Sequence, residues 1–277
     1  MPSRPPTDVQ VARILRAAAP ARPILVGGQA IAAWRQVSSG DQGGHDLASK
    51  DIDFFRNPEA VRLLVDAFGG TSRTPGFDDH GPIAHVVSIP VDGTTLEIDF
   101  IGHVLGADPK KMPKRAIGIP YDPADSGETI VLALIHPIDA LWSRLANINT
   151  LGRDDPLSIR QCAAAIDVLE AFLFYLLDDG QGAHRMRTKI LRELCHGLAK
   201  AHVGRPAQII HCLSPERIIP RALERADLDP RWRRLTLQRL WASLQRRLRK
   251  AKERDGNERE RGSKHLVRAP YAFPSDL

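Results

Sequence analysis

The spacing of apolar residues changes along this chain, and that change limits the folds open to it. In the first part, apolar residues form short runs that end at glycine, proline or asparagine, as strands and short helices do. From Glu128 onward they recur almost entirely at helical spacing. The pattern predicts an α/β domain over residues 1–135, a helical domain over 136–255 and a tail over 256–277.

The first part begins with alternating helix and strand signals. Thr7 is a suitable N-cap for a first helix. The apolar run Ile24–Val26, closed by Gly27-Gly28, predicts a strand and a tight turn, and helical spacing resumes after it. The residues between 38 and 49 have the composition of a loop, and 51–55 predicts a second short strand.

Turn residues define the next elements. Asn57-Pro58 predicts the start of a helix that ends near Gly69-Gly70. Residues 83–91 and 94–101 flank Asp92-Gly93, a dipeptide typical of tight hairpin turns. The helices expected in the second part span residues 137–149, 156–177, 183–201 and 229–254.

Composition excludes several classes of protein. A chain of 277 residues with 43% hydrophobic and 26% charged residues can bury a core without disulfides or a structural metal. Its three cysteines are widely spaced and odd in number, which favours a reducing, cytoplasmic setting. No apolar run approaches about 18 residues, so we expect no membrane partner.

Positive charge is concentrated near the C-terminus. Residues 231–268 contain 14 Lys and Arg against 4 Asp and Glu, whereas the rest of the chain contains 25 against 29. Such asymmetry favours a partner that carries phosphate, and we rank nucleic acid above lipid. Trp232 and Trp241 lie among these arginines and would either stack on bases or, as we favour, anchor the helix to a core. The alternative is a solvated basic helix without a partner.

Three aspartates have the spacing of a metal site. Asp51 and Asp53 lie two apart on an expected strand, so their side chains point to the same side. Asp99 lies on a later strand, between apolar neighbours that face the core. Together they would supply three carboxylates, the ligands that Mg²⁺ prefers, and two ions about 3.5–4 Å apart would promote phosphoryl chemistry. The alternative is a set of solvent-facing aspartates.

Phosphate-binding features accompany these aspartates. The Gly27-Gly28 turn precedes a helix whose first N–H groups and dipole favour an anion, although such a turn is also common in purely structural roles. Arg144 and Asn147 share a helix face. Arg144 would either reach a bound nucleotide from the second domain or form an interdomain salt bridge or a cap.

Three segments in this order resemble the polymerase-β-like nucleotidyltransferase superfamily. They are Val26–Ile31, Ser49–Phe54 and Glu97–Phe100. Within the superfamily the chain is most similar to bacterial nucleotidyltransferase-like proteins related to the abortive-infection toxin family. The resemblance implies an α+β fold, with a mixed sheet and flanking helices followed by an all-helical C-terminal domain.

The resemblance also implies roles for individual residues. Gly27 and Gly28 would hold the triphosphate of a nucleoside triphosphate (NTP), with further phosphate contacts from Ser49 and Lys50. Asp51, Asp53 and Asp99 would bind two Mg²⁺ ions, and Asp99 would also activate the acceptor hydroxyl. The implied reaction transfers a nucleoside monophosphate from the NTP to a hydroxyl group.

The acceptor and the partners follow from the resemblance only in outline. It suggests tRNA or another nucleic acid, bound through the basic C-terminal helix, and a toxin-like protein with an antitoxin partner. Two alternatives stay open: an aminoglycoside-type transferase with a small-molecule acceptor, and a non-catalytic module that binds nucleotide or nucleic acid. The Gly-Gly form and the long interval between Gly28 and Asp51 favour the second alternative.

Overall fold

The computed structural model divides the chain into two compact units. It describes residues 6–39, 47, 51–76, 82–122, 128–176, 181–198, 207, 210–226, 228–250 and 253. The first unit comprises Met1–Asp178 and Gly204–Pro215, and the second comprises Asp179–Val203 and Glu216–Leu277. The predicted tail over residues 256–277 lies outside the described residues.

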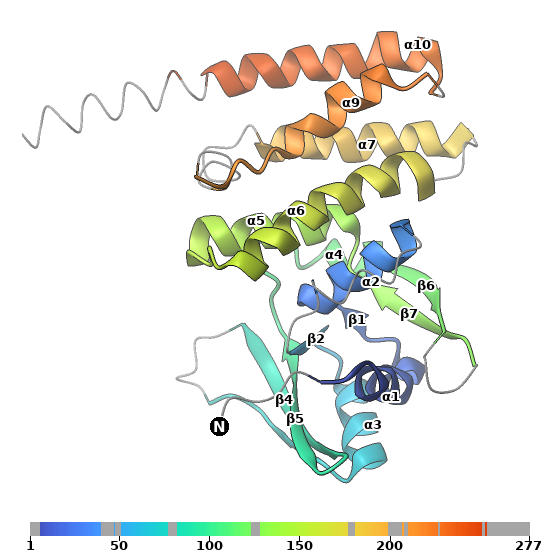
Figure 1. Ribbon diagram of the computed structural model, residues 1–277, viewed down its shortest axis with the longest axis vertical. Helices are drawn as coiled ribbons and strands as arrows, with labels where there is room; N and C mark the ends of the chain where they lie inside the picture. Colours follow the sequence, from blue (N-terminus) through green and yellow to red (C-terminus); the bar gives the residue numbers. More distant parts are fainter. Residues whose placement is uncertain are drawn as a thin grey trace, which may run out of the picture. The chain divides into compact units, whose positions relative to one another are not determined.

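The first unit is built from strands and helices in mixed order (Figure 1). Its elements are α1 (Asp8–Ala18), β1 (Ile24–Leu25), α2 (Gly27–Ser39), β2 (Ile52–Phe55), α3 (Pro58–Phe68), β3 (Thr71–Arg73), β4 (Ile83–Val91), β5 (Thr94–Ile101), α4 (Met112–Arg115), β6 (Ile117–Tyr121), β7 (Ile130–Leu134), α5 (Pro137–Leu151) and α6 (Pro156–Ala171). A π-helical turn, Phe172–Leu176, continues α6. The α+β class predicted from the sequence is confirmed.

The strands of the described residues form one mixed sheet. Its seven strands lie in the order β3-β4-β5-β2-β1-β7-β6. β2 pairs with β5 and β1 with β7 in parallel, and the other neighbours are antiparallel. Two strands far apart in sequence order, β2 and β5, therefore lie side by side at the middle of the sheet.

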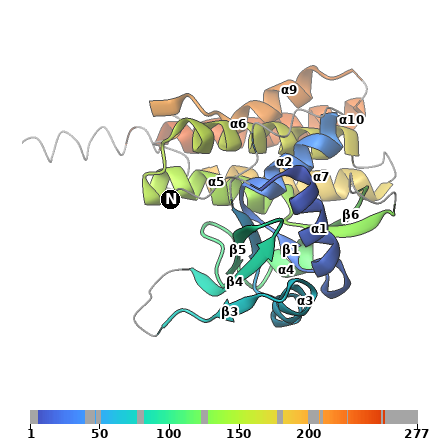
Figure 2. The same ribbon diagram turned by 60° about the horizontal axis from the view of Figure 1, so that its bottom comes forward.

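Local sequence signals account for several element ends. The side chain of Thr7 accepts a hydrogen bond from the N–H of Gln10, and Asn57 caps α3 in the same way. Asp92 and Gly93 both have positive φ, at 49° and 77°, as a tight two-residue hairpin turn requires. The predicted hairpin is confirmed with its two strands at residues 83–91 and 94–101, and Figure 2 shows it beside α3.

The helical pattern expected from Glu128 onward is wrong for its first segment. Residues 130–134 form β7, which pairs in parallel with β1 and antiparallel with β6. Five successive apolar residues carry no periodicity that separates a strand from a helix, and pairing with β1 decides between them.

The predicted boundary near residue 135 falls inside the first unit. α5 and α6, which follow it, pack against each other and against α2. The indole N–H of Trp34 on α2 donates to the carbonyl of Ile135 at 2.8 Å, and the Trp34 ring meets Phe172 edge to face. The chain also returns to this unit at Ala207, whose N–H donates to Oδ1 of Asn149 at 3.1 Å. The sheet and these helices therefore share one core.

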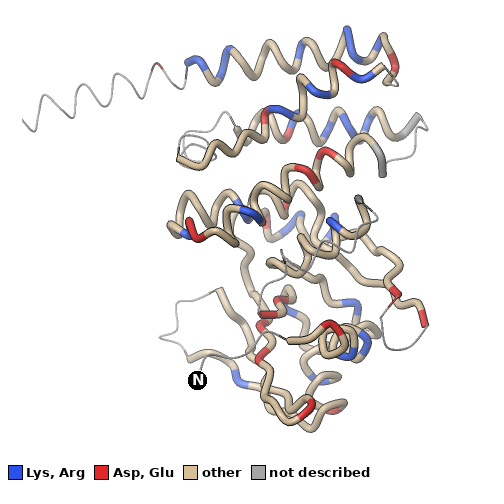
Figure 3. The backbone as a smooth tube through the Cα atoms, viewed as in Figure 1, with Lys and Arg blue, Asp and Glu red and all other residues tan. Residues whose placement is uncertain are grey.

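The second unit is helical. It contains α7 (Gln181–Leu198), α9 (Ile218–Glu224) and α10 (Pro230–Trp232), which continues through a π-helical turn, Arg233–Leu237, into helical residues 238–250. Figure 3 shows Lys and Arg recurring along α7 and along the helix that begins at α10. No described helix combines the length and the apolar character needed to cross a membrane.

Candidate functional site

Two aspartates lie side by side where β2 and β5 run in parallel. Asp53 is opposite Asp99 in the register of these strands. Because Ile52 and Ile98, the residues before them, are buried, Asp53 and Asp99 share the other face of the sheet, with their backbones about 4.8 Å apart. Asp51, which is exposed, immediately precedes β2. The sheet thus sets Asp53 beside Asp99, and Asp51 lies just outside the strand, two residues before Asp53.

Asp53 and Asp99 resist ionisation. Burial, followed by the negative charge of Asp99 and to a lesser degree that of Asp51, raises the pKa of Asp53 to about 7. The pKa of Asp99 is also raised, first by burial and then by Asp51 and Glu97. A negative charge on Asp99 therefore makes the ionisation of Asp53 harder. A cation at this place would relieve the repulsion.

Gly27 lies directly against Asp53. Its φ is +69°, and a Cβ atom at this position would overlap Oδ2 of Asp53 and lie 2.9 Å from its Cγ and 3.0 Å from its Cβ. The N–H of Val26 donates to the backbone carbonyl of Asp53 at 2.9 Å. Glycine is required here because α2 begins against the aspartate, a reason that sequence reasoning did not find.

Of the other residues predicted to contact phosphate, the structure describes Gly28 but not Ser49 or Lys50. Gly28 is buried in the first turn of α2, a turn whose N–H groups have no acceptors within their own helix. Ser49 and Lys50 lie outside the described residues. Of the segment before Asp51, the structure describes only Leu47, which is buried.

Arg144 supplies positive charge at Asp53. It lies on α5, and its charge acts to lower the pKa of Asp53, with a smaller contribution from Arg153. Burial lowers the pKa of Arg144 itself, and the carboxylate of Asp53 counteracts that change. An arginine nevertheless keeps its proton in a protein. The side chain of Arg144 donates a hydrogen bond to Gln161, which belongs to the same unit. The predicted contact of Arg144 with a nucleotide stays a prediction.

Gln161 joins Arg144 to the segment that leads to the aspartates. Its Oε1 accepts from Nη1 of Arg144 at 2.9 Å, and its Nε2 donates to the carbonyl of Leu47 at 2.8 Å. Sequence reasoning missed this residue. The available signal is a polar residue on the apolar stripe of a helix, in line with Ala165 and Val168.

We expect Gln161→Leu to destabilise the protein by about 1–3 kcal/mol, because the buried Leu47 carbonyl and the Arg144 guanidinium each lose a hydrogen bond. The free energy of unfolding in urea measures the loss. Gln36→Leu, the same substitution on the exposed face of α2, is the matched control and should change it by no more than about 0.5 kcal/mol. Equal effects in the two variants would show that the bridge contributes nothing.

No family model, curated protein or solved structure matches this chain. What the site does must therefore be argued from its own geometry. The resemblance to polymerase-β-like nucleotidyltransferases stays a prediction.

The carboxylates of these three aspartates are the type of ligand that a hard divalent cation such as Mg²⁺ prefers. Asp51, Asp53 and Asp99 offer carboxylate oxygens, and burial together with neighbouring negative charge raises the pKa of Asp53 and of Asp99. Within the part of the chain that the structure describes, no three His, Cys, Asp or Glu side chains lie close enough to hold one ion. The aspartate side chains would have to turn toward one another to bind it.

Proposed function

We propose that the first unit is a polymerase-β-like, metal-dependent nucleotidyltransferase domain. It would transfer a nucleoside monophosphate from an NTP to a hydroxyl acceptor and release pyrophosphate. The observation that carries the proposal is the parallel register of β2 and β5, which sets Asp53 beside Asp99 and next to the glycine that opens α2. Carboxylates, a helix N-terminus and a half-buried arginine are the groups that this reaction needs together.

Asp51, Asp53 and Asp99 would hold Mg²⁺. Bound ions of this kind supply charge neutralisation to the triphosphate and to the leaving pyrophosphate. The acceptor oxygen attacks the α-phosphorus, and the bond between that phosphorus and the bridging oxygen to the β-phosphate breaks. The proton of the hydroxyl passes to the carboxylate of Asp99, whose raised pKa suits it to accept a proton.

The triphosphate would lie between α2 and α5. The first-turn N–H groups at Gly27 and Gly28 offer donors to phosphate oxygens, and the helix dipole favours their charge. Arg144 would add a fixed positive charge that Gln161 orients. We keep Ser49 and Lys50 as predicted phosphate contacts.

The acceptor that best suits the chain is a nucleic acid. The second unit carries Arg246, Arg247 and Arg249 exposed on residues 238–250, and a surface of this charge favours a polyanion. Transfer to tRNA, and an antitoxin that restrains it, remain predictions from the resemblance.

A second candidate function is nucleotide binding without catalysis. The Gly27-Gly28 form and the long interval between Gly28 and Asp51 favour it. The two functions differ in a direct measurement, since a binding module would take up NTP in calorimetry with Mg²⁺ and release no pyrophosphate.

The test of transfer uses the purified protein with Mg²⁺, each α-labelled NTP in turn and total RNA. We expect label in RNA and an equal amount of released pyrophosphate. Asp99→Asn should lower the rate about 10²-fold or more, because the proton acceptor is lost.

Glu97→Gln is the matched control, because Glu97 lies on the same strand and face, two residues away, and holds no assigned role. It should keep the wild-type rate within about threefold, with a small acid shift of the pH profile, because its charge raises the pKa of Asp99. Wild-type pyrophosphate release by Asp99→Asn would overturn the assignment.

A further inference from the structure

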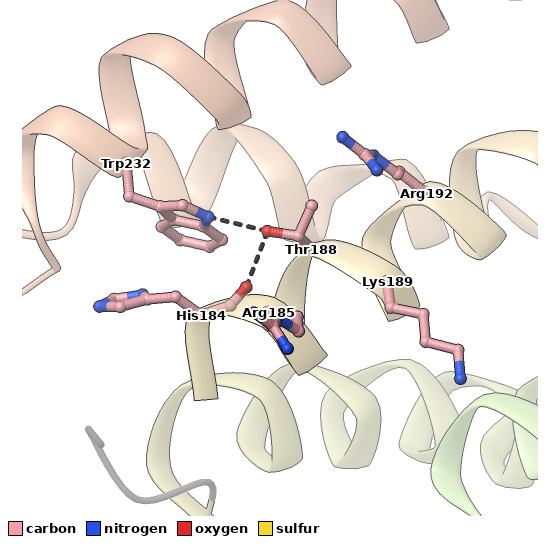
Figure 4. Close-up of a pocket in the computed structure, with 6 residues that line it drawn as sticks. All are labelled: His184, Arg185, Thr188, Lys189, Arg192 and Trp232. Atoms are coloured by element: carbon pink, nitrogen blue, oxygen red, sulfur yellow. Dashed lines mark hydrogen bonds between the residues drawn. The ribbon is translucent and has the colours of Figure 1, made fainter. Parts of the chain in front are cut away.

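The second unit contains an open groove that the aspartate site does not use. It has a volume of about 490 Å³, within the range of ligand sites. Five of its lining residues come from α7 and the sixth from α10: His184, Arg185, Thr188, Lys189, Arg192 and Trp232. Figure 4 shows Trp232 on one side of Thr188, and Lys189 and Arg192 on the other. No lining residue is acidic.

Three cations of this groove carry charge that the described residues do not neutralise. Arg185, Lys189 and Arg192 are exposed and form no ion pair with any described residue. Their spacing of four and then three positions places them on one face of α7, with neighbours about 5–6 Å apart. A row of cations at this spacing suits successive negative charges on an extended chain.

The aromatic wall of the groove is held in a fixed orientation. Nε1 of Trp232 donates to Oγ1 of Thr188 at 2.9 Å, and that hydroxyl donates to the carbonyl of His184 at 2.7 Å. The ring of His184 lies beside the indole, with centroids 5.3 Å apart. Trp232 thus ties the start of α10 to α7 and also lines the groove.

We propose that this groove binds single-stranded nucleic acid, with backbone phosphates on Arg185, Lys189 and Arg192 and one base against Trp232. Cations beside a pre-oriented aromatic ring are the combination by which proteins bind single strands without reading sequence. An acidic peptide would engage the cations, but its acidic side chains offer no aromatic ring to stack on the indole. The proposal does not rest on the transfer reaction and would hold if that reaction failed.

The test measures binding of a short, fluorescein-labelled single-stranded RNA of mixed sequence by anisotropy. NTP is omitted and a chelator is present, so neither metal nor catalysis contributes. The first variant is Arg185→Gln/Lys189→Gln/Arg192→Gln. We expect its affinity to fall about 10-fold or more, and its slope of log affinity against log salt to fall by about 2, as for three lost phosphate contacts.

The matched control is Lys110→Gln/Lys114→Gln/Arg160→Gln, which removes the same charge from exposed positions of the first unit. It should lose clearly less affinity than the groove variant. Equal losses would mean that net charge alone attracts RNA and would overturn the groove. Binding of polyglutamate as tight as that of RNA would overturn it in favour of an acidic protein partner.

Trp232 is tested in two steps. Trp232→Ala should weaken RNA binding about 5- to 100-fold if one base stacks there, whereas Trp232→Phe, which keeps a ring but loses the bond to Thr188, should retain most of the affinity. Circular dichroism checks that both variants are folded. Loss of binding in a folded Trp232→Phe equal to that in Trp232→Ala would overturn the stacking contact.

Discussion

Asp53→Asn is expected to stabilise the protein above pH 7 while lowering pyrophosphate release about 10³-fold or more. In chelator-containing buffer the gain should be about 2–4 kcal/mol in the free energy of unfolding. The reason is that the wild-type protein must ionise a buried carboxyl beside Asp99, at a pKa of about 7. The amide fills nearly the same space without charge, but it is a poor ligand for a cation.

The pH dependence follows from the direction of the shift. The pKa of Asp53 rises from 3.8 when unfolded to about 7 when folded, so between these values the folded protein binds more protons. Stability is then lost as pH rises, and the loss is complete above the folded pKa. The advantage of Asp53→Asn over wild type should be close to zero below pH 3.8 and largest above pH 7.

Urea unfolding across this pH range measures the effect. Added Mg²⁺ should stabilise wild type above pH 7 and leave Asp53→Asn unchanged, because only the carboxylate gains from a bound cation. Asp66→Asn, on the exposed face of α3, is the control and should follow wild type. A variant no more stable than wild type above pH 7 would contradict the ionisation cost assigned to Asp53.

Gly27→Ala is the second change with a large expected effect. We expect it to destabilise the protein by about 2–5 kcal/mol, from two causes that add. The left-handed conformation that Gly27 adopts costs a residue with a Cβ about 1–2 kcal/mol of conformational energy. The methyl group also meets the Asp53 side chain, and forcing it into this packed place costs about 1–3 kcal/mol more.

Gly93→Ala separates the two causes. Gly93 also has positive φ, at +77°, but a Cβ there would meet no atom within 4 Å, so only the conformational cost of about 1–2 kcal/mol remains. Gly27→Ala made in an Asp53→Ala background should recover part of its excess cost. Thermal unfolding of the single and double variants measures both. Equal losses for the two glycine variants would contradict the contact with Asp53.

The parts of this fold that local chemistry decides could be predicted from sequence. Thr7, Asn57 and the Asp92-Gly93 turn act within three or four residues, and their elements begin or end where expected. The shared face of Asp53 and Asp99 follows from the alternation of side chains along a strand.

Contacts between distant segments could not be predicted. The hydrogen bond of Gln161 to Leu47 joins positions 114 residues apart, and no periodicity shows it. The apolar residues of β7 suit a strand or a helix equally well until β1 is present as a partner. The groove likewise forms only because Trp232 of α10 lies against α7. The charge pattern of the sequence pointed to the C-terminal helix and gave no sign of α7.

The return of the chain to the first unit at Ala207 sets an order for its synthesis. The first unit is complete only when residues 204–215 have left the ribosome, because Ala207 packs against α5 through Asn149. By then all of α7 has also been synthesised, whereas Trp232, which donates a hydrogen bond to Thr188 of α7, has not. A chain that ends after residue 178 would therefore lack part of the first unit, including the contact of Ala207 with Asn149.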